Sequence, residues 1–457
     1  MTQQLRLSAI PLYLMLCIFL GGSTRGHWAN MVLQLIAIAI IAWAALTRRP
    51  AQLPKTGYVL VLVVGLLLLL IALQLLPLPP AIWSALPGRG FIANGYALLG
   101  QPLPWLPISL APYQTLASAL WLLPPLAILA GILRLGAYQM SWLAAGLCIA
   151  TFVAVLVGTL QVASGDPVSS SWYFYKFSNF GQATGFFANS NHMATLLIVA
   201  IPFLVALFGS RRIRAKSAQA SASKTAILAG GLIVILLGLA LNSSLAGWGL
   251  GVPVVAASAL LGVPSKRNWA RWSMAGVALL GAASVALIFG SPLQANLSAA
   301  GAETSVETRS TMFKTSLTAA ADFAPAGSGV GTFADIYPRY EDPLTVGRTY
   351  VNHANSDFIE ILLETGVPGV ILVGLFLFWW GRRLIAIWRA PNVDHYARAA
   401  TIASAAILAH SFVDYPLRTS AISAVFAMCL ALMVQPRRGM TMEPARGEQK
   451  ARHLSVG

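Results

Sequence analysis

Residues 351–366 read Val-Asn-His-Ala-Asn-Ser-Asp-Phe-Ile-Glu-Ile-Leu-Leu-Glu-Thr-Gly and end a hydrophilic stretch of an otherwise apolar chain. We call residues 291–365 the polar island. It also holds a glycine-rich segment at 327–333, Gly-Ser-Gly-Val-Gly-Thr-Phe. Its basic side chains are Arg309, Lys314, Arg339, Arg348 and His353. We expect most of the chemistry to be located in this island.

The chain around the island has the composition of a membrane protein. Of 457 residues, 57% are apolar and 10% charged, and the mean hydropathy is +0.72. Soluble proteins carry about 25% charged residues, and runs of about 20 apolar residues match a hydrocarbon core about 30 Å thick. The sequence therefore predicts an all-α polytopic membrane protein with about 12 transmembrane helices. The predicted spans are 8–22, 28–46, 57–76, 113–133, 139–162, 185–209, 225–241, 245–263, 273–290, 366–381, 396–413 and 419–435.

Four parts follow from these spans. Residues 1–290 are expected to hold spans one to nine, with short cytoplasmic and two longer periplasmic loops. Residues 291–365 form a large periplasmic loop domain between spans nine and ten. Residues 366–435 hold spans ten to twelve, and 436–457 form a disordered cytoplasmic tail.

Charge is distributed unevenly between the two predicted faces. The short joints and termini of one face hold 22 of the 30 Lys and Arg but three of the 14 Asp and Glu, a net charge of +19 against −3 for the opposite face. Because positive charge marks the cytoplasmic side, both termini are predicted to be cytoplasmic and the island to face outward. The total of +16 is then an orientation and lipid-binding signal, and no nucleic-acid partner is expected.

The cysteines and the N-terminus add little. Cys17, Cys148 and Cys429 lie in apolar runs, so we interpret them as small packing residues. The first apolar run has no convincing cleavage site, and more spans follow it, so no removable signal peptide is expected.

Two other outward joints carry aromatic and polar side chains. The joint at 77–112 is rich in proline and tryptophan, which suits an interfacial segment, a re-entrant spacer or a platform for a lipid substrate. The joint at 164–184 carries Trp172, Tyr173 and Tyr175 beside Lys176, either a membrane-interface belt or a surface for sugar. Asn191 and His192 follow at the outer end of a span, where polar side chains line a cavity or pair with one another.

Within the island the pattern predicts three local structures. Residues 312–322 suit a helix lying along the membrane. The glycines at 327–331 lack the spacing of a dinucleotide site and the lysine of a P-loop, and indicate a turn with positive φ. A short helix then begins after Asn355 or Ser356 and ends near Gly366. Its acidic residues share one face, which is expected to line a wet space or to meet the island's arginines: Asp357, Glu360 and Glu364.

Near the C-terminus, His410 and Asp414 lie one helical turn apart at the outer surface. We interpret Asp414 as a partner of Arg418, of His410 or of a cation on the island.

Together these residues resemble the O-antigen ligase and polymerase family of bacterial inner-membrane proteins. The resemblance spans roughly residues 60–435, and the blocks at 327–366 are its most specific part. The motifs that carry it, in chain order, are Pro77-Leu-Pro with Pro107-Ile-Ser-Leu, Gly185-Phe-Phe-Ala-Asn-Ser-Asn-His, Arg309 before an amphipathic run, Gly327-Ser-Gly-Val-Gly-Thr-Phe with Tyr337-Pro, Asn352-His-Ala-Asn-Ser-Asp to Glu364-Thr-Gly, and His410-Ser-Phe-Val-Asp.

The resemblance implies a GT-C-like fold and a metal-independent, inverting glycosyl transfer without a cofactor. A glycan leaves undecaprenyl pyrophosphate and joins a hydroxyl of another glycan, of lipid A-core or of another acceptor. His353 would help activate the acceptor, and Arg309 would hold the pyrophosphate; these two are the expected catalytic residues. The expected substrate-binding residues are Arg348, Arg339, Lys176, Asn191, Asn355 and Asp357.

The chain departs from the family pattern at two positions. Asn355 stands where the family usually has histidine, and His353 lies two residues earlier, where many relatives carry an additional one. Leu245 stands where the family usually has arginine after span seven, and Arg348, Arg339 or Lys176 could replace that cation. These departures leave a divergent or weakened member as an alternative.

The preferred reading is a cell-envelope glycan transferase, with polysaccharide polymerase slightly favoured over ligase. The rivals are a transporter of lipid-linked polysaccharide and a non-catalytic membrane scaffold. Transporters often show two similar halves and charged residues within their spans, and neither feature is evident here.

Overall fold

The computed structural model describes residues 3–24, 27–48, 51–209, 218–263, 275–277, 279–284, 286, 305–343 and 351–434. The tail predicted at 436–457, part of the span predicted at 273–290 and Arg348 lie outside these residues. Over the described part the fold is helical, apart from an antiparallel pairing of two short strands, β1 (Pro77–Leu78) and β2 (Leu106–Pro107), which the all-α prediction did not include.

Within the described residues, eight helices are long and apolar enough to cross a membrane. They are α1 (Gln3–Leu20), α2 (Trp28–Leu46), α3 (Lys55–Leu75), the run Pro112–Leu135, α8 (Met140–Ala163), α9 (Ser190–Gly209), α10 (Ala218–Asn242) and α16 (Asp357–Arg389). The run Pro112–Leu135 comprises α6 (Pro112–Trp121), α7 (Leu123–Ala130) and a π-helical turn, η1 (Gly131–Leu135). Shorter helices complete the bundle: α11 (Leu245–Ala259), Ala275–Ser284, α17 (His395–His410) and α18 (Ser420–Val434). The predicted fold class is thus confirmed as a multi-helix membrane protein, and the count of twelve spans stays a prediction.

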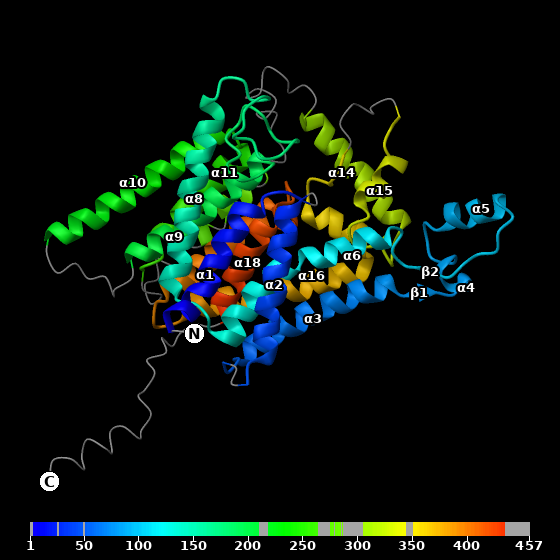
Figure 1. Cartoon of the computed structure of the whole chain (residues 1–457), viewed down its shortest axis with the longest axis horizontal. Helices are drawn as coiled ribbons and strands as arrows, with labels where there is room; N and C mark the ends of the chain where they lie inside the picture. Colours follow the sequence, from blue (N-terminus) through cyan, green and yellow to red (C-terminus); the bar gives the residue numbers. More distant parts are fainter. Residues whose placement is uncertain are drawn as a thin grey trace, which may run out of the picture.

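The core of the bundle is formed by α9, α17 and α18, with α8, α11, α1 and α7 packed around them. Small side chains allow close approach in membrane bundles, and α17 and α18 bury alanine repeatedly along their lengths. By contrast, α3, α10 and α16 leave most of their apolar side chains exposed, as expected for helices that face lipid. Figure 1 shows α3 and α16 side by side at one edge of the molecule.

Four arginines cap helix C-termini. A helix C-terminus carries partial negative charge and unpaired carbonyls, which cations stabilise. Each of the four belongs to the joints predicted to be cytoplasmic. The donor–acceptor pairs are Arg6 to the carbonyl of Leu135, Arg134 to Ala44, Arg383 to Met433, and Arg398 to Leu261 and Val263.

The described part of the island folds against the N-terminal end of α16 and the C-terminal end of α3. It contains α14 (Ser305–Asp322), α15 (Phe333–Ile336) and the 3-10 turn η3 (Tyr337–Arg339). Met312, Phe323, Phe333 and Tyr337 form a small core with Leu363 of α16. Thus α14 packs on α16, and the island is fixed to the head of a spanning helix.

Gly366 breaks α16 where the sequence predicted a helix end. Its φ of 58° and ψ of −148° are not helical, but the chain resumes a helix and continues to Arg389. A side chain here would have no room, because an added Cβ would collide with the carbonyl of Pro325. The first two turns of α16 therefore form a separate helix joined to the span by a glycine kink.

Gly366→Ala should destabilise the protein by at least about 1–3 kcal/mol, the usual range for a residue held in such a backbone region. Gly374→Ala is the matched control on the same helix, because nothing lies within 4 Å of a Cβ there. Thermal unfolding in detergent should show a lower midpoint for Gly366→Ala and an unchanged or slightly raised one for Gly374→Ala. Equal midpoints would contradict this account of the kink.

Candidate functional site

One guanidinium joins the acidic face at the head of α16. Arg418, in the 3-10 turn η4 (Pro416–Arg418), lies 3.3 Å from Glu360 through Nη1, 3.0 Å from Glu364 through Nη2 and 3.6 Å from Asp357 through Nε. The three acidic side chains are at most 3% exposed and Arg418 is 19% exposed. The acidic face was predicted correctly. In the described residues its cation is Arg418 of η4, which the sequence analysis did not name for this face. Contact with a wet space or with the island's arginines stays a prediction, because the side chains of Arg309 and Arg348 lie outside the described part.

The charge of Arg418 is secured by these neighbours. Burial alone disfavours the charged guanidinium, but attraction to Glu360, Glu364 and Asp357 outweighs it and raises the pKa of Arg418 above its usual value. Arg418 therefore stays protonated at any physiological pH. Its attraction is shared among three carboxyl groups, and it joins η4 to α16.

His353 binds the same acidic face. Its Nδ1 lies 3.0 and 3.2 Å from the two carboxylate oxygens of Glu360, and the backbone N–H of Ala354 donates to the same group. An ionised carboxylate only accepts hydrogen bonds, so Nδ1 is the protonated nitrogen in this arrangement. Nε2 then carries the free lone pair. The His353 side chain is 16% exposed, so it is partly accessible to solvent.

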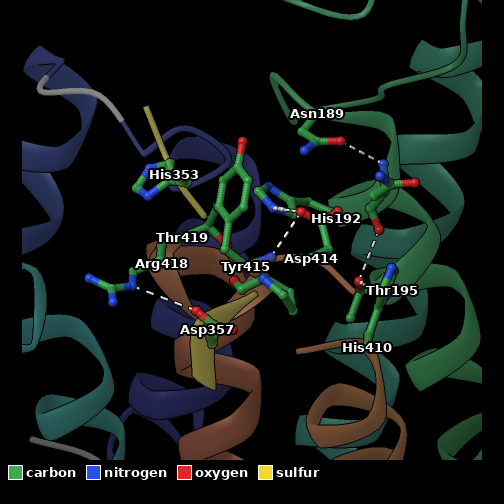
Figure 2. A network of polar contacts seen from close by, with 12 residues as sticks. Asn189, His192, Thr195, His353, Asp357, His410, Asp414, Tyr415, Arg418 and Thr419 are labelled. Carbon is green, nitrogen blue, oxygen red and sulfur yellow. Dashed lines mark hydrogen bonds and ion pairs between the residues drawn. The ribbon is translucent and has the colours of Figure 1, made fainter. Parts of the chain in front are cut away.

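Tyr415 separates His353 from a second histidine. The rings of His353 and Tyr415 are 4.2 Å apart at 31°, and His192 meets the Tyr415 ring edge-on at 5.0 Å (Figure 2). Tyr415 and Arg418 belong to one short segment. That segment therefore places both the guanidinium that contacts Glu360 and the Tyr415 ring that packs against His353.

Behind Tyr415 lies a second polar cluster. Nε2 of His192 is 3.8 Å from Oδ1 of Asp414, and Nδ1 of His410 is 2.7 Å from Oγ1 of Thr195. The predicted partners of Asp414 were Arg418, His410 or an island cation. Among the described residues the carboxyl group of Asp414 faces His192, and the guanidinium of Arg418 is turned to α16 (Figure 2). The backbone N–H of Asp414 also donates to the carbonyl of His410.

Asn191 and Asn355, both expected to bind substrate, are held by protein contacts. Oδ1 of Asn191 accepts a hydrogen bond from Ser244, which also caps α11. Asn355 has a φ of 50° and directs its amide toward the sulfur of Met312 at 3.7 Å. Asp357 accepts a hydrogen bond from Ser411 at 2.7 Å besides its contact with Arg418.

The expected cations are placed apart from this acidic face or remain undescribed. The Arg339 guanidinium lies 3.5 Å over the ring of Phe91, and Lys176 lies near the ring of Phe177. Arg309 is in α14, beside α16, but its side chain lies outside the described part. Arg348 lies outside the described residues altogether.

The glycine segment adopts the turn that the sequence predicted. Gly327, Gly329 and Gly331 all have positive φ, between 79° and 112°. An added Cβ at any of them would collide with neighbouring residues. The N–H of Gly331 donates to Oε1 of Glu364 at 2.8 Å, so the loop also binds the acidic face.

Two residues that the sequence analysis missed hold this loop. Nε2 of Gln74 donates to the carbonyl of Glu364, and its Oε1 accepts from the N–H of Val330. Arg89 donates to the carbonyl of Gly327 at 2.8 Å. A signal existed for both, since Gln74 is the one polar residue in the last turns of α3 and Arg89 is the one charged residue between 77 and 112.

Replacing Arg418 with Gln should destabilise the fold by about 3–5 kcal/mol, since it leaves buried carboxylates without their cation. Arg382→Gln is the matched control, because Arg382 is exposed near the other end of α16 and contacts a Phe378 ring. Thermal unfolding in detergent should separate the two variants clearly. Similar midpoints would show that Arg418 does not hold the acidic face together.

A comparison with known families identifies this region. The family model described as O-antigen ligase matches residues 230–374. No curated protein matches the chain. The matched range runs from α10 through the island to the kinked helix α16, and it includes Arg309, the glycine loop, His353 and all three carboxylates. Over residues 230–374 this match supports the resemblance to the O-antigen ligase and polymerase family that the motifs indicate.

Proposed function

We propose that the protein is a membrane glycan transferase that moves a glycan from undecaprenyl pyrophosphate to an acceptor hydroxyl. The reaction takes place at the periplasmic face of the bacterial inner membrane, in the synthesis of a cell-surface polysaccharide. The observation that carries this proposal is the His353–Glu360 pair, which lies at the head of α16 within the range that the family model matches.

The pair suits a general base. The Glu360 carboxylate accepts from Nδ1, fixes the ring and stabilises the imidazolium that forms when Nε2 takes a proton. In the proposed step Nε2 removes the proton of the acceptor hydroxyl, and the oxygen attacks the anomeric carbon. The bond from that carbon to the pyrophosphate oxygen breaks, and its electron pair leaves with the diphosphate. Attack from the opposite side inverts the anomeric configuration.

The leaving diphosphate needs cations other than Arg418. That guanidinium is shared among three carboxyl groups, so it has little attraction left for a fourth anion. Arg309 and Arg348 are the proposed ligands, because guanidinium groups bind phosphate oxygens in pairs and stay charged. Arg339 and Lys176 are the further candidates. With fixed cations in these positions the developing charge is stabilised without a metal ion.

The two departures from the family pattern have local explanations. Asn355 is turned toward Met312, while His353 contacts Glu360, which favours His353 over position 355 as the base. Ser244 and Asn191 are hydrogen-bonded to each other beside Leu245, and no cation takes part in that contact. We therefore propose that the missing arginine is replaced from the island.

Polymerase and ligase differ in the acceptor, and we slightly favour the polymerase. The acceptor of a polymerase is another lipid-linked repeat, whereas a ligase uses lipid A-core. The length of the product distinguishes them: a polymerase extends the chain, and a ligase moves a finished glycan.

His353→Ala and Glu360→Gln should reduce transfer by about 10²- to 10⁴-fold, the usual contribution of general acid–base catalysis. Arg309→Ala should also reduce it strongly, through loss of diphosphate stabilisation. The assay uses purified protein in liposomes, undecaprenyl-pyrophosphate-linked glycan from the native host, a chelator and no added metal, and it measures release of the lipid pyrophosphate.

Two substitutions remote from the acidic face serve as controls. His395→Ala changes a histidine at the start of α17, at the opposite end from His410, and Arg382→Ala removes a cation at the far end of α16. Both should retain wild-type transfer. Full activity of His353→Ala would rule out the proposed base, and absence of turnover by the wild type with every acceptor would favour a transporter or scaffold.

A further inference from the structure

The segment between α3 and α6 forms a separate lobe. We call residues 76–111 the outer lobe; it contains β1, α4 (Pro80–Trp83), α5 (Gly90–Leu98) and β2. Figure 1 shows it projecting beyond the ends of α3 and α6, at the edge of the molecule. Since α3 leads into it and α6 leads out, both of its ends lie at one membrane face. Arg89 of the lobe binds Gly327 of the island, so lobe and island share that face.

The surface of the outer lobe is apolar to an extent unusual for a segment in water. Leu98 is 89% exposed, Leu99 73% and Trp105 63%, and Ile82 and Phe91 are exposed as well. Adjoining the lobe, Tyr113 at the start of α6 is 88% exposed. Contiguous exposed apolar groups indicate a protein or membrane interface.

The lobe's own residues contribute almost no charge to this surface. Residues 77–112 contain one charged residue, Arg89, and its side chain is buried and donates to carbonyls of Ile108 and Gly327. Burial lowers the pKa of Arg89 to about 10, which still leaves it protonated at neutral pH. The lobe therefore adds no charged side chain of its own to this surface, and the exposed guanidinium of Arg339, from the island, lies over the Phe91 ring at one place on it.

The apolar surface continues along the spanning helices. Leu69 and Leu73 on α3 and Leu116 and Leu120 on the run from Pro112 are exposed, as lipid-facing residues are. The outer lobe extends this lipid-facing surface past the ends of both helices. Trp105 and Tyr113 are of the residue types that concentrate at the level of lipid headgroups.

The backbone of the lobe also suits an interface of low water content. Residues 77–112 contain eight prolines, and each removes a backbone N–H that would otherwise need a partner. The indole of Trp83 donates to the carbonyl of Pro104, and Ser109 donates its N–H to the carbonyl of Gln74. Because unpaired polar groups are costly in lipid, fewer donors mean a smaller cost of burial at the membrane surface.

We propose that the outer lobe lies in the membrane leaflet on the island side, with Leu98, Leu99 and Trp105 among the lipid chains at the headgroup boundary. Its partner is the phospholipid bilayer itself. Of the three alternatives that the sequence analysis gave for the joint at 77–112, this proposal adopts the interfacial segment.

This placement has a consequence that rests on the proposed function. Arg89 and Gln74 hold the glycine loop, and the loop binds Glu364 of the acidic face. A lobe fixed in the leaflet therefore holds the His353 site at a constant height above it. The reacting pyrophosphate of a lipid-linked donor lies at headgroup level, so this height brings donor and base together.

Spin labels on single cysteines test the placement directly. Leu98→Cys and Leu99→Cys, labelled in proteoliposomes, should be relaxed more by oxygen, which concentrates in lipid, than by a water-soluble nickel chelate. Leu62→Cys, exposed in the middle of α3, is the lipid control, and Val168→Cys, exposed in another outward joint, is the aqueous control. The native Cys17, Cys148 and Cys429 are buried, and unlabelled wild type corrects for any residual reaction.

Labels at 98 and 99 should be relaxed more by oxygen than by the nickel chelate, with a ratio between those of the labels at 62 and 168. A greater effect of the nickel chelate would place the lobe in water and overturn the proposal. Weak relaxation by both reagents would mean that protein covers the lobe, a second copy or another partner, and would overturn it as well. The spin-label measurement does not depend on glycan transfer. If the protein proved inactive but its labels lay in lipid, the placement of the lobe would stand and the proposed function would fail.

Discussion

The outer half of the protein depends on one guanidinium shared by three buried carboxyl groups. Arg418 contacts Asp357, Glu360 and Glu364 within the first two turns of α16, and each carboxyl group has a second task. Asp357 accepts from Ser411, Glu360 accepts from His353, and Glu364 accepts from the glycine loop. A buried carboxylate is tolerated only with such partners. The ion cluster therefore joins the C-terminal segment, the histidine and the loop into one unit, and the kink at Gly366 lets that unit deviate from the axis of the span.

At the other end of the bundle, four arginines bind helix ends instead of carboxyl groups; these are Arg6, Arg134, Arg383 and Arg398. There they meet helix C-terminal carbonyls, whose partial negative charge is a property of the backbone. The positive excess on that face is thus more than an orientation signal, because four of its arginines also satisfy polar groups that lipid would leave unpaired. The three carboxyl groups of α16 lie instead beside the island.

Local features could be predicted from the sequence, and pairings across the chain could not. The positive φ of the glycine loop, the acidic face of the helix at 357–364 and the break at Gly366 follow from residue type and spacing within a few positions. The partners of Asp414 and of the acidic face depend on how α9, α16 and the 410–418 segment pack. In the ion cluster, Arg418 contacts carboxyl groups that lie 54 to 61 positions earlier in the chain. His192 and Asp414 are 222 positions apart. Spacing in the sequence carries no information about such encounters, so Arg418 and the island arginines were equally good candidates.

The ion cluster also bears on two requirements of the proposed reaction, activation of the acceptor by a base and departure of the diphosphate. A base that takes a proton gains from a nearby carboxylate, since the imidazolium is stabilised, whereas a departing diphosphate is repelled by one. With Glu360 beside His353 and Arg418 engaged by three carboxyl groups, the α16 face suits the acceptor and disfavours the diphosphate. The proposed ligands of that anion are therefore cations other than Arg418. In the proposed step the acceptor oxygen lies between His353 and the anomeric carbon, and the diphosphate leaves on the opposite side of that carbon, which is the geometry that an inverting attack requires.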